Sequence, residues 1–151
     1  MPNVYAILGD ANTRKSSTTR ALTGVEQHKS VTVATASGDI EVFVQISSLQ
    51  ELNVFPNDFI SQVMAEGHKN VLVELWISSR THMRTVYPPG PDYLLAFLNA
   101  GWAIRHVVVL GVSSVSRSLP PGAPSPNFIP QSASTPVNRI ASQIRAWWAW
   151  L

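Results

Sequence analysis

The chain has no cysteine, few charged residues and no long apolar run. The absence of cysteine excludes disulfides and thiolate metal sites. Charged residues make up only 13% of the chain, and no run of Lys or Arg accompanies the formal net charge of +2. A strong signal for nucleic-acid binding is therefore missing. No apolar stretch approaches the roughly 18 residues of a membrane-spanning helix, so we expect a cytoplasmic protein that does not enter a membrane.

Two common kinds of catalytic site are missing as well. No GxSxG motif is present, so the serines lack the local signature of a serine hydrolase. The histidines lack the spacing of metal ligands, and we expect each at the surface or at a strand edge. They are His28, His68, His82 and His106.

The remaining sequence has the size and pattern of one globular domain. It is 151 residues long and 45% hydrophobic, which is enough to bury a core. Apolar runs predict strands at residues 3–8, 31–35, 40–46, 71–77 and 107–112. Helical patterns predict helices at residues 16–22, 58–66, 92–100 and 137–150, the second of them capped by Asn57 or Asp58. The proline-containing segment 78–91 and the Ser/Pro-rich segment 113–136 are predicted to be irregular.

This order of elements predicts a three-layer α/β fold. Strands that alternate with helices form a mostly parallel sheet with helices on both faces, and the runs at 31–35 and 40–46 should pair as one antiparallel hairpin. We expect a core over residues 1–112, a connection over 113–136 and a C-terminal helix over 137–151 that packs on the core. Ligands bind beyond the carboxyl ends of such strands. The loops at 9–15, 47–51, 78–90 and 113–117 should therefore share one edge.

Residues 9–16, GDANTRKS, carry the clearest functional signal. In a phosphate-binding loop, a glycine turns the chain out of a strand, and backbone N–H groups and a helix N-terminus then face the anion. A lysine reaches the terminal phosphates, and the next Ser or Thr binds magnesium. Gly9, Lys15 and Ser16 have the spacing of the GxxxxGK[ST] pattern, but Arg14 replaces the second glycine. Arg14 could add a cation to a polyphosphate site. The alternative is a strand–turn–helix whose Arg14 and Lys15 face solvent.

The stretch GDANTRKSSTTRALTG resembles the first loop and helix of P-loop NTPases, most closely the GTPases related to translation factors. The order of strands and helices over residues 3–112 is similar too. The resemblance implies a P-loop NTPase-like fold that binds a nucleoside triphosphate, with Lys15 on the β- and γ-phosphates, Ser16 on Mg²⁺ and Ser17 near the α-phosphate. The implied phosphate-binding residues are Gly9, Asp10, Ala11, Asn12, Thr13, Arg14, Lys15, Ser16 and Ser17.

Other motifs of that family have no clear counterpart. An acidic residue should end the third strand and hold magnesium through water, but Gln45 and Ser47 stand there. Glu74 lies in mid-strand, where we expect it to point to a helix-covered face. Serines occupy the position of the guanine-binding Asn-Lys-x-Asp motif. We therefore expect binding of a nucleotide or another polyphosphate with no defined base, and hydrolysis that is slow or partner-dependent.

Arginines follow two of the predicted strands. Arg80, Arg84 and Arg117, with His82 beside the first two, could line a cleft for a second anionic group. A P-loop kinase or transferase would use them to clamp its acceptor. They could equally be solvated loop residues.

The C-terminal helix has a broad apolar face, made of Ile140, Ile144, Trp147, Trp148 and Leu151. This face either completes the core or meets a protein partner or a second copy through Trp147 and Trp148. A non-catalytic interaction protein is therefore a third hypothesis, beside nucleotide binding and phosphoryl transfer.

Overall fold

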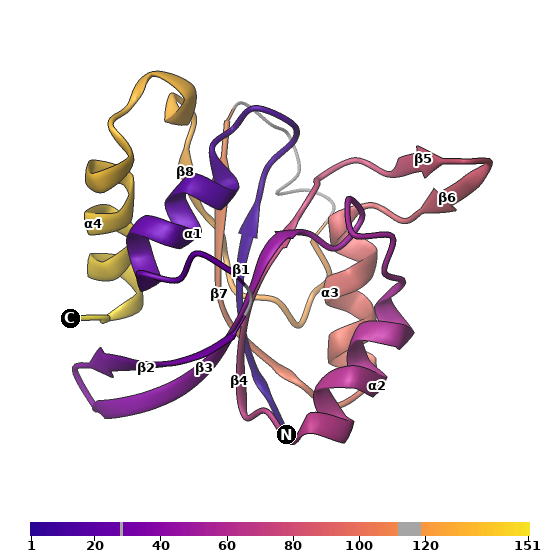
Figure 1. Ribbon diagram of the computed structural model, residues 1–151, viewed down its shortest axis with the longest axis horizontal. Helices are drawn as coiled ribbons and strands as arrows, with labels where there is room; N and C mark the ends of the chain where they lie inside the picture. The colour runs from indigo at the N-terminus through magenta and orange to yellow at the C-terminus, as the bar shows by residue number, and fades with distance from the viewer. Residues whose placement is uncertain (28, 112–118) are drawn as a thin grey trace.

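A computed structural model describes residues 1–27, 29–111 and 119–151 of the protein. The protein has a three-layer α/β architecture (Figure 1). Helices α1 (Lys15–Thr23) and α4 (Val137–Trp148) cover one face of a sheet, and α2 (Pro56–Glu66) and α3 (Gly90–Asn99) cover the other. The six strands lie in the order β2-β3-β4-β1-β7-β8. Their bounds are β1 Asn3–Leu8, β2 Lys29–Thr35, β3 Gly38–Ser48, β4 Asn70–Leu75, β7 Ala103–Leu110 and β8 Asn127–Ile129.

The sheet is mostly parallel, as the sequence predicts. Strand β1 pairs in parallel with β4 on one side and β7 on the other. Strand β3 is parallel to β4, and β8 is parallel to β7. Only β2 runs against its neighbour, in the predicted hairpin with β3. Strands β1, β4 and β7 are near-continuous apolar runs because helices bury them from both faces.

Alternate residues of the strands build a core on each face of the sheet. Leu8 belongs to the core under α2 and α3, together with Phe59 and Phe97. Its neighbour Ile7 belongs to the core under α1 and α4, together with Ile144. The end of β1 is therefore fixed from both sides, and the loop that follows starts from a rigid point.

The C-terminal helix α4 completes the second core, which is the simpler of the two expectations for it. Trp148 is 3% exposed and packs at 5.5 Å from Tyr5, centroid to centroid. Trp150 lies beyond the helix and is also buried, because Ala149 adopts a left-handed conformation that returns the chain to β2. Trp147 is half-buried. Trp148 is therefore part of the interior and offers no open surface to a partner.

Several predicted element boundaries are wrong. Helix α2 begins at Pro56 with Phe55 as its N-cap, so Asn57 and Asp58 lie in its first turn and do not cap it. Proline fits the first turn of a helix because its missing N–H would have no partner there. Helix α3 likewise begins early, at Gly90. Strand β4 ends at Leu75, before the predicted end at residue 77.

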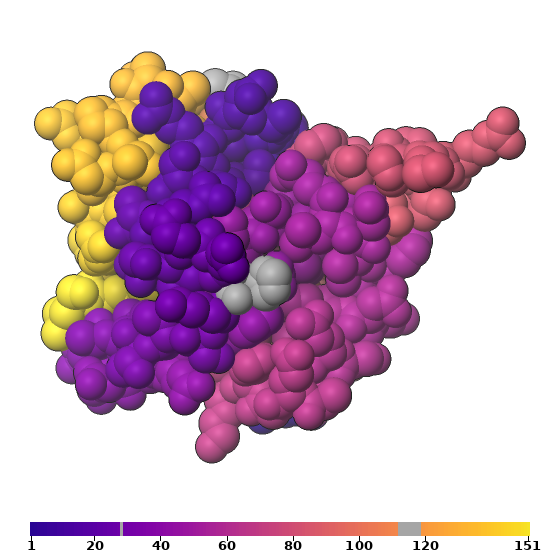
Figure 2. Space-filling view, in the orientation of Figure 1, coloured from indigo at the N-terminus to yellow at the C-terminus, as the bar shows by residue number. Residues whose placement is uncertain are grey.

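The two segments predicted to be irregular contain regular structure. Segment 78–91 forms a hairpin of β5 (Arg80–His82) and β6 (Thr85–Tyr87), which projects from the body of the molecule (Figures 1 and 2). In segment 113–136, β8 extends the sheet and a 3₁₀ helix, η2 (Ser132–Ser134), follows it. Residues 113–118 of that segment lie outside the described residues. Within the three described ranges, no helix has the length and apolarity to cross a membrane.

Candidate functional site

The loop of residues 9–17 leaves the carboxyl end of β1 and enters α1. Gly9 donates its backbone N–H to the carbonyl oxygen of Leu75 at 3.0 Å. A Cβ atom at this position would collide with the hydroxyl of Thr13 and would lie 3.0 Å from the carbonyl oxygen of Leu110. The first glycine of the motif is therefore required by close approach of the chain, and not by a positive φ.

The backbone of this loop presents a series of free donors. Asn12 and Arg14 have φ values of 66° and 71°, whereas Thr13 between them is not left-handed. Such alternation turns successive N–H groups toward one concavity. Apart from the turn over Ala11 and Asn12, the described residues offer no acceptor to the backbone N–H groups of residues 10–17, and the next N–H along the chain, that of Thr18, donates to Arg14 at 2.9 Å. These donors stand at the positive end of the α1 dipole, where anions are stabilised.

The side chain of Lys15 is held inside the loop. It is only 6% exposed, and Nζ donates to the carbonyl oxygen of Asp10 at 3.0 Å. Burial lowers the pKa of Lys15, and the nearby carboxylates of Glu51, Glu74 and Asp10 oppose that shift. The end of the Lys15 side chain therefore lies within the turn, and the alternative in which both Arg14 and Lys15 face solvent holds only for Arg14, which is exposed.

Glu74 lies directly behind the loop on the neighbouring strand. It is paired in register with Ile7, points to the face that α1 covers and is fully buried. Its Oε1 accepts a hydrogen bond from the Ser16 hydroxyl at 2.8 Å, while Oε2 has no partner among the described residues. Burial raises the pKa of Glu74, and the bond from Ser16 opposes this. The sequence signal for such a buried, hydrogen-bonded carboxylate was the single acidic residue in the apolar run VLVELW, because a buried charge needs a partner or a metal.

A hollow of about 270 Å³ opens over the loop. It is lined by residues 11–17 and by Glu51, and we call it the loop hollow. Asp10 stands beside it and accepts hydrogen bonds from Ser78, from N–H at 3.2 Å and from the hydroxyl at 2.9 Å. Three of the predicted loops, 9–15, 47–51 and 78–90, thus meet at one edge of the sheet as expected. The fourth, 113–117, lies outside the described residues.

The turn that carries Glu51 is held by a set of polar contacts that sequence reasoning missed. Gln50 is fully buried, accepts the backbone N–H of Trp76 at 3.0 Å and donates to the carbonyl oxygens of Trp76 and Pro88. The indole Nε1 of Trp76 donates to Glu51 Oε1 at 3.0 Å. Glu51 is therefore tied to the chain segment that directly follows β4.

The predicted arginine cluster does not assemble at the loop hollow. Arg80 donates to the carbonyl oxygen of Gln50 and to Asn53 Oδ1, at 2.9 and 3.0 Å. Arg84 is exposed at the turn of the projecting hairpin. Arg117 lies outside the described residues. Of the loop cations, Arg14 is exposed, lines the hollow and donates to the carbonyl oxygen of Thr135 at 3.2 Å.

Comparison of the chain with models of protein families, with curated proteins and with solved structures gives no match. The geometry of the site is therefore the evidence for function.

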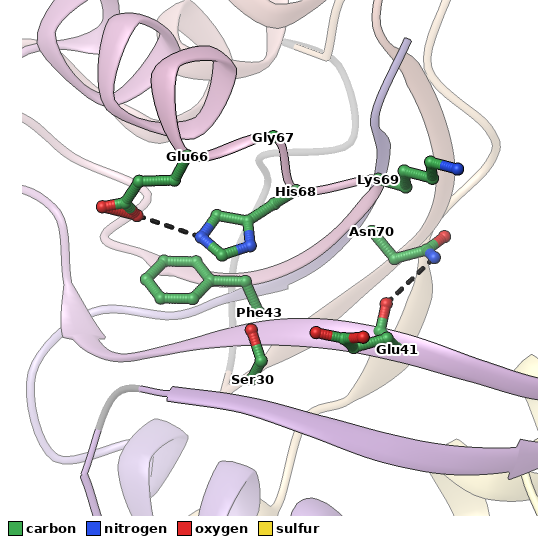
Figure 3. Close-up of a pocket in the computed structure, with 8 residues that line it drawn as sticks. All are labelled: Ser30, Glu41, Phe43, Glu66, Gly67, His68, Lys69 and Asn70. Atoms are coloured by element: carbon green, nitrogen blue, oxygen red, sulfur yellow. Dashed lines mark hydrogen bonds and ion pairs between the residues drawn. The ribbon is translucent and has the colours of Figure 1, made fainter.

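A second hollow, of about 440 Å³, lies at the opposite edge of the sheet (Figure 3). The register places Asn70 beside Asn3, at the amino end of β1. His68 stacks on Phe43 with ring centroids 4.2 Å apart and contacts Glu66 Oε1 at 3.0 Å. Glu66 is engaged by that ring, and Asn70 donates to the carbonyl oxygen of Glu41 at 3.0 Å. Among the described residues, no loop of backbone donors lines this hollow, which makes it the weaker candidate despite its larger volume. Across the described parts of the chain, no cluster of three or more His, Asp or Glu side chains is placed to hold a metal ion unaided.

Proposed function

We propose that residues 9–17 bind the terminal phosphates of a nucleoside triphosphate, or of another polyphosphate, together with Mg²⁺. Hydrolysis on this proposal is slow or partner-dependent. The observation that carries it is the hydrogen bond from the half-buried Ser16 to the fully buried Glu74, directly beside the backbone N–H groups of the loop.

Three features of the loop suit a polyphosphate. Outside the turn at Ala11 and Asn12, the N–H groups of residues 10–17 have no acceptor among the described residues, and they lie at the N-terminal end of a nine-residue helix. Lys15 adds a charge that is already held in the turn by Asp10. Glycine at position 9 lets the chain close on itself tightly enough to form the hollow. These features match what the resemblance to P-loop NTPases implies.

The residues also fit a magnesium ion that arrives with the nucleotide. Mg²⁺ takes oxygen ligands and is normally shared between one or two protein groups and phosphate oxygens. The Ser16 hydroxyl would be its direct protein ligand, and Glu74 would orient that hydroxyl. Oε2 of Glu74 has no hydrogen-bond partner among the described residues, and a cation at Ser16 would offset the cost of burying this carboxylate further than Lys15 alone does. The ion would neutralise phosphate charge. Glu74 thus supplies the acidic residue that is missing at Gln45 and Ser47.

Titration calorimetry with ATP and with GTP, each with and without Mg²⁺, tests the proposal. Lys15→Ala removes a charge-assisted contact worth about 2 kcal/mol, so we expect the Kd to rise about 30-fold. Lys69→Ala is the matched control, because Lys69 is an exposed lysine at the opposite edge of the sheet, and it should bind as the wild type does. Ser16→Ala should bind nucleotide without any effect of Mg²⁺.

Equal affinities of the wild type and Lys15→Ala would contradict the proposal, and so would a wild type that binds neither nucleotide nor inorganic triphosphate. The latter result would favour the non-catalytic interaction protein. The partner of such a protein would then have to bind a surface that does not include Trp148, because Trp148 is buried.

A further inference from the structure

Glu51 is the exception among the residues that line the loop hollow. Among the described residues that line the hollow, Glu51 is the acidic residue, and all the others belong to the loop of residues 11–17. A carboxylate repels phosphate, so its presence works against the affinity of an anion site. A negative side chain at this position therefore needs a reason other than binding the phosphates.

The contacts around Glu51 hold it in place. Trp76 Nε1 donates to its Oε1 at 3.0 Å, and Glu51 lines the hollow. The guanidinium of Arg80 lies 5.9 Å from the centre of the Trp76 ring and also donates to the backbone of Gln50. Buried Gln50 joins the same turn to the backbone of Trp76. Such supporting contacts are what a positioned catalytic group requires.

The charges near the hollow also indicate which kind of nucleophile could attack a terminal phosphate bound there. An anionic acceptor would need cations at the rim that are free to bind it. Among the described residues, the exposed cation that lines the hollow is Arg14, and it donates to the carbonyl oxygen of Thr135. Arg80 donates to Gln50 and Asn53, and Arg84 stands at the exposed turn of the β5–β6 hairpin. Glu51 would itself repel a negative acceptor. The surroundings therefore suit a nucleophile that carries no charge.

We propose that Glu51 is the general base of this site, and that it takes the proton from an uncharged hydroxyl, either water or a neutral alcohol, as that oxygen attacks the terminal phosphate. The inference depends on the proposed function. In the step, the hydroxyl oxygen bonds to the terminal phosphorus and its proton moves to the Glu51 carboxylate. The bond from that phosphorus to the bridging oxygen breaks, and its electron pair leaves with the nucleoside diphosphate. Lys15 and the N–H groups of the loop stabilise the charge on the phosphates.

Glu51→Gln is the direct test, because it removes the base and keeps the size and the bond from Trp76. A positioned general base contributes about 10²–10⁴-fold, so we expect phosphate release from ATP or GTP to fall at least 100-fold. The nucleotide Kd should stay within twofold or tighten, since a repulsive charge is lost. Glu26→Gln is the control for loss of one negative charge, because Glu26 is 87% exposed and lies outside the hollow. It should keep the wild-type rate.

Trp76→Phe tests the positioning of Glu51 separately. Phenylalanine keeps a ring beside Arg80 but removes the Nε1 donor, so we expect kcat to fall about tenfold with unchanged nucleotide affinity. In the Glu51→Gln background the same substitution should have no further effect.

A label on the terminal phosphate distinguishes the two nucleophiles. Label in inorganic phosphate identifies water, and label in phosphorylated glycerol identifies a neutral alcohol. Glycerol 3-phosphate is the anionic counterpart of glycerol and should receive no label.

Three outcomes would overturn the inference: a Glu51→Gln rate within threefold of the wild type, no phosphate release by the wild type, or transfer to glycerol 3-phosphate. The proposed function can survive each of them, because it fails only if nucleotide binding is absent or does not depend on Lys15.

Discussion

Arg14 adopts a backbone conformation in which glycine is the usual residue. Its φ of 71° and ψ of 28° are left-handed, which costs a residue with a Cβ roughly 1–2 kcal/mol. Its exposed side chain gains one hydrogen bond, to the carbonyl oxygen of Thr135. A bond at the surface offsets only part of that cost. The strain persists because the rest of the loop, from Gly9 to the start of α1, fixes the local path of the chain.

Replacing this arginine with glycine should therefore stabilise the protein. For Arg14→Gly we expect the free energy of unfolding to rise by about 1 kcal/mol, measured by urea denaturation at neutral pH. The matched control is Arg20→Gly. Arg20 lies inside α1 with ordinary helical geometry, so glycine should lower stability there by about 1 kcal/mol. A loss of stability in both variants would show that the Arg14 side chain stabilises the loop more than its backbone strains it.

Among the elements, α1 depends on α4 at the end opposite the loop. The last carbonyl groups of a helix have no partners within it. The guanidinium of Arg145 on α4 donates hydrogen bonds to two of these carbonyl oxygens, those of Ala21 at 2.7 Å and Leu22 at 3.3 Å. It also adds positive charge at the negative end of the helix dipole. The C-terminal helix therefore holds the helix that begins at the loop of residues 9–17.

Arg145→Ala should destabilise the protein by about 2 kcal/mol, because bonds from a charged donor contribute about 1.5–3 kcal/mol and the two carbonyls would lose their partner. Thermal or urea unfolding would measure the change. Arg139→Ala removes an exposed arginine from the same helix and should change stability by less than about 0.5 kcal/mol. Similar losses in the two variants would contradict the capping role.

The elements that sequence analysis predicted are those with strong periodicity or long apolar runs. The β5–β6 hairpin was missed because its turn consists of Met83 and Arg84, with φ values of 48° and 67°. Both central positions of such a turn normally carry Asn, Asp or Gly. Strand β8 was missed because Asn127–Ile129 is only three residues long and lies among prolines. Its place in the sheet comes from pairing with β7, which no local pattern encodes.

At the scale of the whole molecule, the buried Glu74 links stability to pH. Burial raises the pKa of Glu74 in the folded chain, so the folded state binds more protons than the unfolded state between the ordinary and the raised values. Its contribution to stability is therefore complete below the ordinary range of a glutamate and is lost as the pH rises through the raised value. The carboxylate is retained at a cost in stability at neutral pH.

Glu74→Gln should remove this dependence. We expect the variant to unfold at a higher urea concentration than the wild type at neutral pH, with the difference shrinking as the pH falls. Glu41→Gln, at an exposed strand position, should follow the wild type at every pH. The opposite trend, with Glu74→Gln losing stability as the pH rises, would show that the ionised carboxylate stabilises the fold.

Some residues of the candidate site could be predicted from local sequence, and others only from tertiary contacts. Gly9, Lys15 and Ser16 were predictable because their spacing along the chain is itself the signal. Glu74 needed the strand order, since only the pairing of β4 with β1 brings it behind Ser16. Glu51 needed the contacts of Gln50 and Trp76, which come from residues 26 positions apart.

Strand β1 lies between two partners that are both distant in sequence. Asn3 pairs with Asn70 on one side and with Ala103 on the other. Both pairings close long stretches of chain, and contacts of that kind form slowly. Residues 9–17 are synthesised before both partner strands, and their curved path depends on each of them, because Gly9 donates to Leu75 at the end of β4 and packs closely against the carbonyl oxygen of Leu110 at the end of β7. A ligand that recognises this path can therefore engage only chains in which the sheet has closed on both sides of β1, which makes its binding a reporter of completed folding.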